Sequence, residues 1–411
     1  MQPHRASIAI VFAIVLIDML GFGLVMPVLP ALIMDLGHMP VDSAAVWAGW
    51  LGAGYAVMQF VFAPIIGNLS DRFGRRPVLL ASLAGYGIDY AVMGLAPGLW
   101  WLVLGRLAAG ITGASWSAAY AYIADISPPE KRAANFGLMG MAFGFGFIFG
   151  PALGGLLATI GPRVPFLAAA GLAAVNVAIG LVVLRESLPS EHRRAFEWQR
   201  ANAFAGLAAL GRQSAAVLWL AAAQGMWMLA HIVYPAIWSF VAIAAWQYDQ
   251  KAIGLALAVV GLTSALVQGV GLRWVAPRIG ESGAVLLGIT GFCIAAAMYT
   301  VVDTTLGIYA AIIVGALQGF IGPSLQALSS RLVDASSQGE LQGATQAVGS
   351  IAQIVGPPLY AAVFAQFTGP RALADVPAMP LVVAAGFALA AFALFRRAGR
   401  GMDLKPASPA P

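Results

Sequence analysis

The sequence predicts an all-α polytopic membrane protein with twelve transmembrane helices in two pseudo-symmetric six-helix halves. Of its 411 residues, 60% are hydrophobic and only 9% are charged, whereas a soluble domain has about 25% charged residues. Long apolar runs recur along the whole chain, and short motifs recur at about half its length. A chain this poor in charge is expected to use lipid as a solvent.

The twelve helices are predicted from the length of the apolar runs, since a helix that spans a bilayer needs about 20 apolar residues. Twelve runs are of about this length or longer, at 7–34, 44–66, 77–96, 98–124, 133–159, 164–184, 214–242, 250–274, 282–301, 306–331, 340–366 and 376–396. The loops between them are short, so no segment outside the membrane could hold a folded catalytic domain.

The ends of the chain and its basic residues predict the orientation. The first run is too long for a signal-peptide core and contains Asp18, so we expect it to be retained. Most of the 22 Lys and Arg residues fall on the side of the membrane that carries both termini. Cytoplasmic loops are enriched in Lys and Arg, so both termini are predicted to be cytoplasmic. The net charge of +5 reflects this asymmetry and does not indicate nucleic-acid binding.

Two motifs that each occur twice suggest that the chain arose by duplication of a six-helix half. Gly150-Pro151 recurs as Gly356-Pro357, and Arg72-Phe73-Gly74 is answered by Arg278-Ile279-Gly280 at the same offset along the chain. The predicted division is therefore a first half at 1–190, a cytoplasmic linker at 191–213, a second half at 214–400 and a disordered tail at 401–411. Paired halves that hold a substrate between them at the membrane midplane are a transporter design.

Three ionisable side chains are predicted to lie deep within the spans. Asp18 is about midway along the first run, and an ionised carboxylate there is costly without a partner or a proton. Arg106 keeps its charge, so it needs an acid or a water-filled cavity, and Asp89 is its expected neighbour. Each could also be a purely structural group, hydrogen-bonded or ion-paired. Gln59 and His231 are further polar groups among apolar neighbours, with packing as the alternative to a functional role.

The segment 67–77 carries four charges within six residues between two apolar runs, so it is expected to be a loop at the membrane surface. Its sequence, GNLSDRFGRRP, resembles the signature of the loop between helices 2 and 3 in the major facilitator superfamily. The run around Asp18, the segment from Gly105-Arg106 to Asp125, and the segment 144–155 are similar to the twelve-helix drug:proton antiporters. Within these, the chain most resembles the tetracycline efflux proteins.

The resemblance implies the major facilitator fold, and together with the polar residues of the spans it predicts three groups of functional residues. Proton coupling and the substrate cavity are assigned to Asp18, Gln59, Asp89, Arg106 and His231. A conformational latch at the cytoplasmic surface, in which Asp71 pairs with charges near the end of the fourth span, is assigned to Gly67, Asp71, Arg72, Gly74, Arg75, Arg76, Asp125 and Arg132. An antiporter hinge motif is assigned to Gly144, Gly150, Pro151, Gly154 and Gly155.

The predicted function is proton-coupled efflux of a small, largely apolar compound, tetracycline-like or another drug, by alternating access. The resemblance implies a monomer in the plasma membrane that needs no cofactor beyond the proton gradient. Tetracycline itself would be carried as a magnesium chelate. A facilitator or solute uptake carrier without proton coupling is the alternative. An enzyme is not expected, because the chain has no HExxH, GxSxG or Walker A motif, and its single cysteine, Cys293, excludes a multi-cysteine metal site.

The second half departs from the tetracycline efflux pattern. These proteins commonly carry a histidine in the eighth span and an acid in the ninth. The corresponding positions here are near Thr263 and Ser264, and at Thr290-Gly291-Phe292. The resemblance therefore supports tetracycline as the substrate less strongly than it supports membership of the family. Any proton coupling is expected to depend on residues of the first half and on His231.

Overall fold

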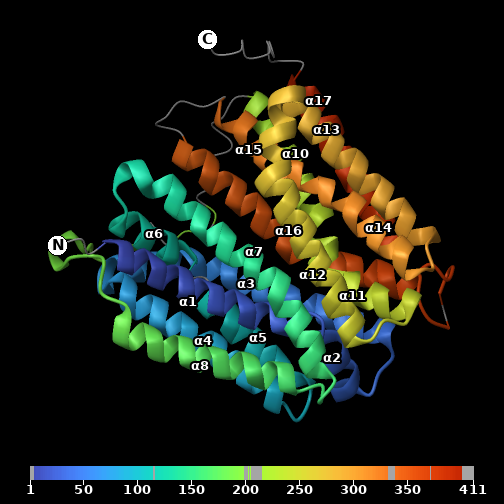
Figure 1. The fold of residues 1–411 in the computed structure, drawn as a ribbon, viewed down its shortest axis with the longest axis horizontal. Coiled ribbons are helices and arrows are strands. Elements are labelled where there is room, and N and C mark those ends of the chain that lie inside the picture. The colour runs from blue at the N-terminus through green and yellow to red at the C-terminus, as the bar shows by residue number, and fades with distance from the viewer. Residues whose placement is uncertain are drawn as a thin grey trace. The chain divides into compact units, whose positions relative to one another are not determined.

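A computed structural model describes residues 4–113, 116–198, 202, 204, 215–331, 338–370 and 372–399, and its regular structure within these ranges is entirely helical (Figure 1). The chain forms two compact units. Unit 1 consists of Met1–Ala203 and Gln247–Gly261, and unit 2 of Phe204–Trp246 and Leu262–Pro411. The predicted tail 401–411 and much of the predicted linker 191–213 lie outside the described residues, and the division of the chain at 190 and 214 stays a prediction.

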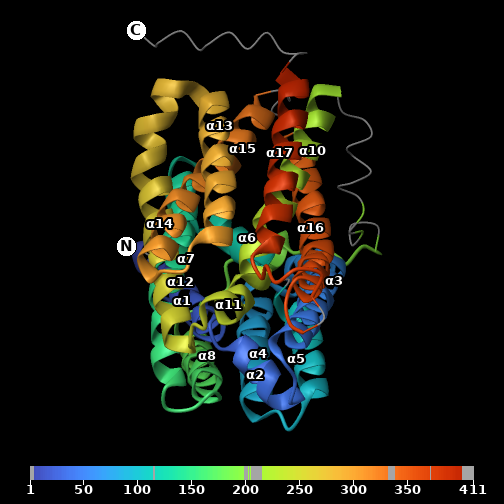
Figure 2. The same ribbon diagram turned by 90° about the vertical axis from the view of Figure 1, so that its right-hand side faces the viewer.

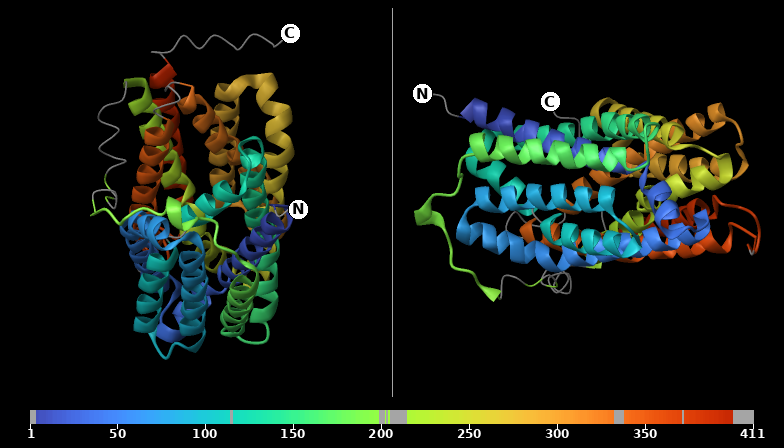
Figure 3. Two further views of the ribbon diagram at one scale, coloured as in Figure 1. Left: turned by 90° about the vertical axis from the view of Figure 1, so that its left-hand side faces the viewer. Right: turned by 90° about the horizontal axis from the view of Figure 1, so that it is seen from below.

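Unit 1 contains the helices of the first half and the beginning of α12. They are α1 (His4–Val25), α2 (Leu29–Gly37), α3 (Val41–Phe73), α4 (Arg75–Leu95), α5 (Leu99–Gly113), α6 (Trp116–Ile126), α7 (Arg132–Ala158) and α8 (Val164–Val183), with short 3₁₀ turns η1 (Pro129–Lys131) and η2 (Ser190–His192). In this unit α1 packs against both α7 and α8, and Figure 3 shows α8 beside α1.

Unit 2 contains the helices of the second half. They are α10 (Ala215–His231), α11 (Val233–Trp246), the end of α12 (Gln250–Leu266), the π-helix η4 (Val267–Gly271), α13 (Leu272–Val301), α14 (Thr305–Gly315), the 3₁₀ segment η5 (Ala316–Phe320), α15 (Ile321–Ser330), α16 (Gln338–Gln366) and α17 (Met379–Gly399). In this unit α10 packs against α16 and α17, which also contact each other (Figure 2).

Ten stretches of the described residues are long and apolar enough to cross a membrane. One of them, Gln250–Val301, contains two predicted spans, because the helix is broken at Gly280. The span predicted at 98–124 is divided between α5 and α6, each too short to be counted alone, and the two residues between them are not described. Taken together, these stretches are consistent with the twelve predicted helices.

Two predicted boundaries differ from the structure. The run at 7–34 is two helices, because α1 ends at Val25 and α2 begins at Leu29, with Pro30 in its first turn. Proline suits a first helical turn but disrupts a helix interior. The segment 67–77, predicted as a loop, is almost entirely helical. Only Gly74 interrupts it, with a φ of 104° that strongly favours glycine.

The structure supports the internal repeat, because helices of the two halves begin and end at the offset that the motifs share. α1 ends at Val25 and α10 at His231, and α5 begins at Leu99 where α14 begins at Thr305. Gly74 and Gly280, which are equivalent in the repeat, both have positive φ, 104° and 69°. The two halves therefore break their helices at equivalent positions, as expected of a duplicated sequence.

Candidate functional site

The two ionisable residues predicted to be neighbours form an ion pair inside unit 1. Asp89 on α4 is 1% exposed, and its carboxylate pairs with the guanidinium of Arg106 on α5. A Cβ atom at Gly105 would lie 2.7 Å from Oδ1 of Asp89, so a glycine beside Arg106 leaves the space that the carboxylate occupies. A buried guanidinium without this partner would be strongly destabilising.

Two tyrosines that were not singled out from the sequence surround this ion pair. The guanidinium of Arg106 lies over the ring of Tyr55, 5.7 Å from its centroid. The Tyr55 hydroxyl is 3.2 Å from that of Tyr86, and the side-chain amide of Gln59 donates to the Tyr55 hydroxyl (3.3 Å) and to the carbonyl of Gly113 (3.2 Å). Gln59 therefore joins α3 to the end of α5. It belongs to the network around Arg106.

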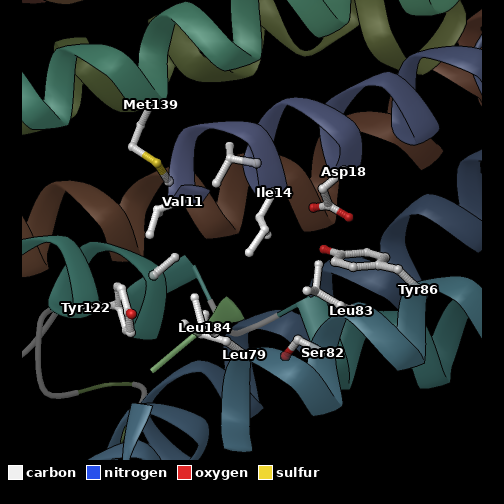
Figure 4. Close-up of a pocket in the computed structure, with 12 residues that line it drawn as sticks. Val11, Ile14, Asp18, Leu79, Ser82, Leu83, Tyr86, Tyr122, Met139 and Leu184 are labelled. Carbon is white, nitrogen blue, oxygen red and sulfur yellow. The ribbon is translucent and has the colours of Figure 1, made fainter. Parts of the chain in front are cut away.

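The Asp18 carboxylate has a different environment. It lies on the wall of a cavity between α1, α4, α6 and α7, where Tyr86 faces it from α4 (Figure 4). The rest of the lining is mostly apolar, with Ser82 and Tyr122 as the other polar residues. Among the described residues, Asp18 has neither an ion pair nor a side-chain hydrogen bond. Tyr86 is thus the residue that connects the Asp18 cavity with the network around Arg106.

The two acids therefore differ in what neutralises them. Asp89 has a fixed counter-charge, whereas Asp18 can lose its charge only by binding a proton or a cation. Unpaired carboxylates within a membrane span are costly when ionised, so such a group is suited to binding and releasing a proton. The sequence placed both acids in the interior but could not distinguish their roles, since the partner of Asp89 lies on another helix.

Three of the predicted latch residues, Asp71, Arg75 and Asp125, meet at the end of unit 1 where α3 is followed by α4. Arg75 forms ion pairs with Asp71 (2.6 Å) and with Asp125 at the end of α6 (3.3 Å). Its guanidinium also donates to the Ser70 hydroxyl (3.1 Å). Arg75 is thus the centre of the cluster, and it connects the end of α3 with the end of α6.

Four other predicted latch residues lie outside this cluster. Gly67 is inside α3, Arg72 lies over the Phe73 ring, and Arg76 donates to the Leu181 carbonyl (2.7 Å). The predicted pairing of Arg132 with Asp71 does not occur among the described residues. Arg132 instead donates to the carbonyl of Ser127 (3.4 Å), because it begins α7 and lies next to the turn that ends α6.

Glu186, which the sequence reasoning missed, attaches the segment after α8 to this cluster. Its carboxylate accepts hydrogen bonds from the backbone N–H groups of Arg75 (2.8 Å) and Arg76 (3.3 Å), the first residues of α4. Gly74 cannot cap α4 with a side chain, so Glu186 satisfies N–H groups that would otherwise lack an acceptor. A Cβ atom at Gly74 would collide with the Glu186 carboxylate. An acid directly after the sixth apolar run was the available sequence signal.

Further contacts continue along the same segment. The Ser187 hydroxyl donates to Asp125 (3.1 Å), and the side-chain amide of Asn68 donates to the Glu197 carbonyl (2.7 Å). The backbone N–H of Arg194 donates to the carbonyl of Asp71 (3.1 Å). Residues 185–197 therefore lie across the latch cluster and form part of it.

The glycines of the predicted hinge motif fall into two groups. Gly150 and Gly154 face α1 so closely that a Cβ atom at Gly150 would lie 2.7 Å from Cα of Gly23. Gly146, one turn earlier, also abuts α1, so glycines at a spacing of four let the two backbones touch. Pro151 is inside α7, and Gly155 faces the start of α12 in the same unit. Gly144 differs, because nothing lies within 4 Å of a Cβ atom built there.

His231 belongs to an aromatic cluster in unit 2. Its ring is 5.7 Å from that of Trp227 and 6.4 Å from that of Tyr234, and both of these also contact Phe292. Phe292 is one of the positions at which the tetracycline efflux pattern has an acid. Here the position is fully buried among aromatic rings. In the part of the chain that the structure describes, no group of three His, Cys, Asp or Glu residues could hold a metal ion.

Comparisons with known proteins agree with this geometry. Residues 11–357 match the Major Facilitator Superfamily. The chain is 41% identical to the class C tetracycline resistance protein of Escherichia coli over 89% of this chain and 91% of the relative. It is 37% identical to the class G protein of Vibrio anguillarum over 89% of this chain and 92% of the relative.

A solved structure supports the fold alone. A bacterial homologue of the human lysosomal transporter Spinster has a TM-score of 0.77, with 16% identity and full coverage of both chains. The chain therefore belongs to the Major Facilitator Superfamily, whose members are membrane transporters rather than enzymes, and it is similar to the tetracycline resistance proteins over most of its length.

Proposed function

We propose that the protein is a proton-coupled efflux transporter that exports a small, largely apolar drug from the cytoplasm by alternating access. The observation that carries this proposal is the Asp18 carboxylate, which lines a cavity inside unit 1 without a counter-charge among the described residues. A carboxylate in this position changes the charge of the membrane interior when it binds a proton. It can therefore couple the proton gradient to the preference of the protein for one conformation.

The remaining groups have distinct roles in this scheme. The pair of Asp89 and Arg106 maintains a fixed polar centre, and Tyr86 transmits a change in the charge of Asp18 to it. Arg75 and its partners form the latch that is made in one conformation and broken in the other, since an exchange of interface salt bridges is a known basis for such two-state behaviour. We place the latch and both termini on the cytoplasmic side of the plasma membrane. The protein acts as a monomer and needs no cofactor.

For the substrate, we propose a tetracycline or another planar, largely apolar drug. The similarity to the tetracycline resistance proteins supports this class of compound. Phe292 stands where the tetracycline efflux pattern has an acid, so we expect the spectrum of exported compounds to differ from that of proteins with an acid in the ninth span. A susceptibility panel in a host without efflux pumps, with tetracycline included, identifies the compounds that are exported.

The coupling is tested in inverted membrane vesicles with an imposed pH gradient, by measuring the accumulation of an exported compound from the panel. Asp18→Asn is expected to abolish accumulation driven by the gradient, because the amide cannot bind and release the proton. Asp303→Asn is the matched control, since Asp303 is an exposed acid between α13 and α14. Full accumulation in Asp18→Asn would remove this carboxylate from the mechanism. Equal flux with and without the gradient in the unchanged protein would identify a facilitator.

A further inference from the structure

The shape of the Asp18 cavity follows two parallel stripes of residues. On α1 it is lined by positions 11, 14, 15 and 18, and on α4 by positions 79, 82, 83 and 86. Both sets have the i, i+3, i+4, i+7 spacing of one helix face. Seven residues of helix correspond to about 10 Å. The cavity is therefore elongated along α1 and α4, with Asp18 and Tyr86 at one end (Figure 4).

The opposite end of the cavity lies beneath the segment that covers the latch. Leu184 and Tyr122 line it there, and both are almost fully buried. The Tyr122 hydroxyl donates to the carbonyl of Arg185 (2.8 Å), the residue before Glu186. Leu79 is four residues after the start of α4, about 6 Å along the helix. The cavity thus ends about one helical turn below the surface that carries Arg75 and Glu186.

The size and lining of the cavity suit water. Its volume is about 60 Å³, and a single water needs about 10–15 Å³. Asp18, Ser82, Tyr86 and Tyr122 supply polar groups along its length. A space of this size holds a short file of waters.

The other side chains around Asp18 offer no proton route to the latch surface, so the cavity is the connection between the two. The hydroxyls of Tyr55, Tyr86 and Tyr90 are within electrostatic reach of its carboxylate, and Arg106 is paired with Asp89. α8 contributes the neutral Asn176, which donates to the Ile14 carbonyl (2.8 Å), and α7 contributes Met139 and a row of glycines. Apart from Asp89, which is held by Arg106, none of these side chains is a carboxylate or a histidine that could pass the proton on.

We propose that this cavity is a hydrated proton passage inside unit 1, which connects Asp18 with the latch surface by way of Ser82 and is closed there by the contact of Tyr122 and Leu184. Protons that Asp18 binds from the outside would then leave it for the cytoplasm through this passage. The inference rests on the proposed function, in which Asp18 is the proton-binding group. It adds the route and its closing element.

The passage is tested with Ag⁺, a probe that reacts with ionised thiols and is small enough to follow water. Cys293 is replaced by Ser, so an introduced cysteine is the only thiol. Inverted vesicles of the full chain are exposed to Ag⁺ in chloride-free buffer. The thiols still free after denaturation are counted by their gel shift with a polyethylene-glycol maleimide. Ser82→Cys is expected to react at least tenfold faster than Ala81→Cys, because Ala81 lies on the exposed apolar face of α4 that also carries Ile88 and Leu95.

A second pair of variants tests the connection to Asp18. Asp18→Cys is expected to react with Ag⁺ in inverted vesicles, and adding Ser82→Leu, which fills the middle of the cavity, should slow that reaction at least tenfold. Adding Ser82→Ala is the control that leaves the cavity open. Tyr122→Phe removes the hydrogen bond to Arg185 and is expected to speed the reaction of the cysteine at position 18 severalfold. Detergent-extracted variants must elute as single peaks in size-exclusion chromatography.

The outcomes separate this inference from the proposed function. Equal rates for cysteines at 81 and 82, or a rate at position 18 that Ser82→Leu does not change, would show that the passage is wrong, whatever Asp18→Asn does to export. An unchanged rate in Tyr122→Phe would exclude Tyr122 as the closing element. If the cysteine at position 18 reacts through the passage but Asp18→Asn still exports with the gradient, the passage stands and the role of Asp18 in coupling fails.

Discussion

The contact between α1 and α7 allows a sharp comparison of two glycines in the same helix. A methyl group added at Gly150 would lie 2.7 Å from Cα of Gly23 and 3.0 Å from both the Gly23 carbonyl carbon and the Leu20 oxygen. Ordinary contacts of this kind begin at 3.4 Å, and all three obstacles are backbone atoms that cannot rotate away. Gly150→Ala must therefore push the two helices apart. Gly144→Ala meets nothing within 4 Å.

The expected energies differ in sign. Overpacking of a tight contact costs about 1–3 kcal/mol, and the gain from replacing a helical glycine by alanine offsets about 0.5–1 kcal/mol of that cost. Gly150→Ala should then destabilise the protein by up to about 2.5 kcal/mol. Gly144→Ala should be neutral or stabilising by up to about 1 kcal/mol. Because α1 also carries Asp18, the separation in Gly150→Ala should disturb proton coupling as well.

The assay is thermal unfolding in one detergent, together with drug accumulation in vesicles under a pH gradient. Gly150→Ala should melt below the unchanged protein and export less, while Gly144→Ala should match or exceed it in melting temperature and retain export. Equal melting temperatures and equal export in the two variants would refute the close contact of α1 with α7. Loss of export in Gly144→Ala alone would instead assign the hinge to Gly144.

Three further predictions concern unit 1 and its repeat. Asp89→Asn leaves a buried guanidinium without a counter-charge and should destabilise the protein by about 3–5 kcal/mol in thermal unfolding. Glu186→Ala removes the hydrogen-bond acceptor at the start of α4, which should destabilise the protein by about 1–2 kcal/mol. Limited trypsin digestion should therefore cut the segment after α8 faster in Glu186→Ala than in the control Glu191→Ala. Equal cleavage of the two variants would exclude this capping role. Gly74→Ala should lower the melting temperature more than Gly280→Ala, because both have positive φ but only Gly74 is also against a carboxylate.

The sequence was sufficient for features that depend on local composition. Runs of apolar residues located the spans, and the positions of Asp18 and Arg106 within them followed directly, because a charge in lipid is conspicuous in any sequence. The internal repeat also emerged from two short motifs. These features need no knowledge of which helices are neighbours.

What the sequence could not supply depends on contacts between distant helices. Tyr86 reads as an ordinary aromatic residue of a span until α1 and α3 bring Asp18 and Tyr55 to it. In the sequence Glu186 is one charge in a polar segment, and only the fold shows that the end of α8 brings it to the start of α4. Residues 67–73 were predicted to form a loop, but they continue helix α3. Charges at a membrane surface are compatible with a helix that extends beyond the membrane as well as with a loop.

The internal repeat allows Asp18 and Tyr86 to be compared with their equivalents in the second copy. The residue equivalent to Asp18 in the second copy is Gln224, which is buried, and the one equivalent to Tyr86 is Phe292. An amide and a phenyl ring cannot bind and release a proton, so the second copy has no counterpart of the proposed proton-binding group at this position. If export is driven by protons as proposed, substitutions in the second copy can change drug preference while Asp18 and Tyr86 stay unchanged. A lineage of such pumps can acquire resistance to new compounds by mutating one half while the other stays constant.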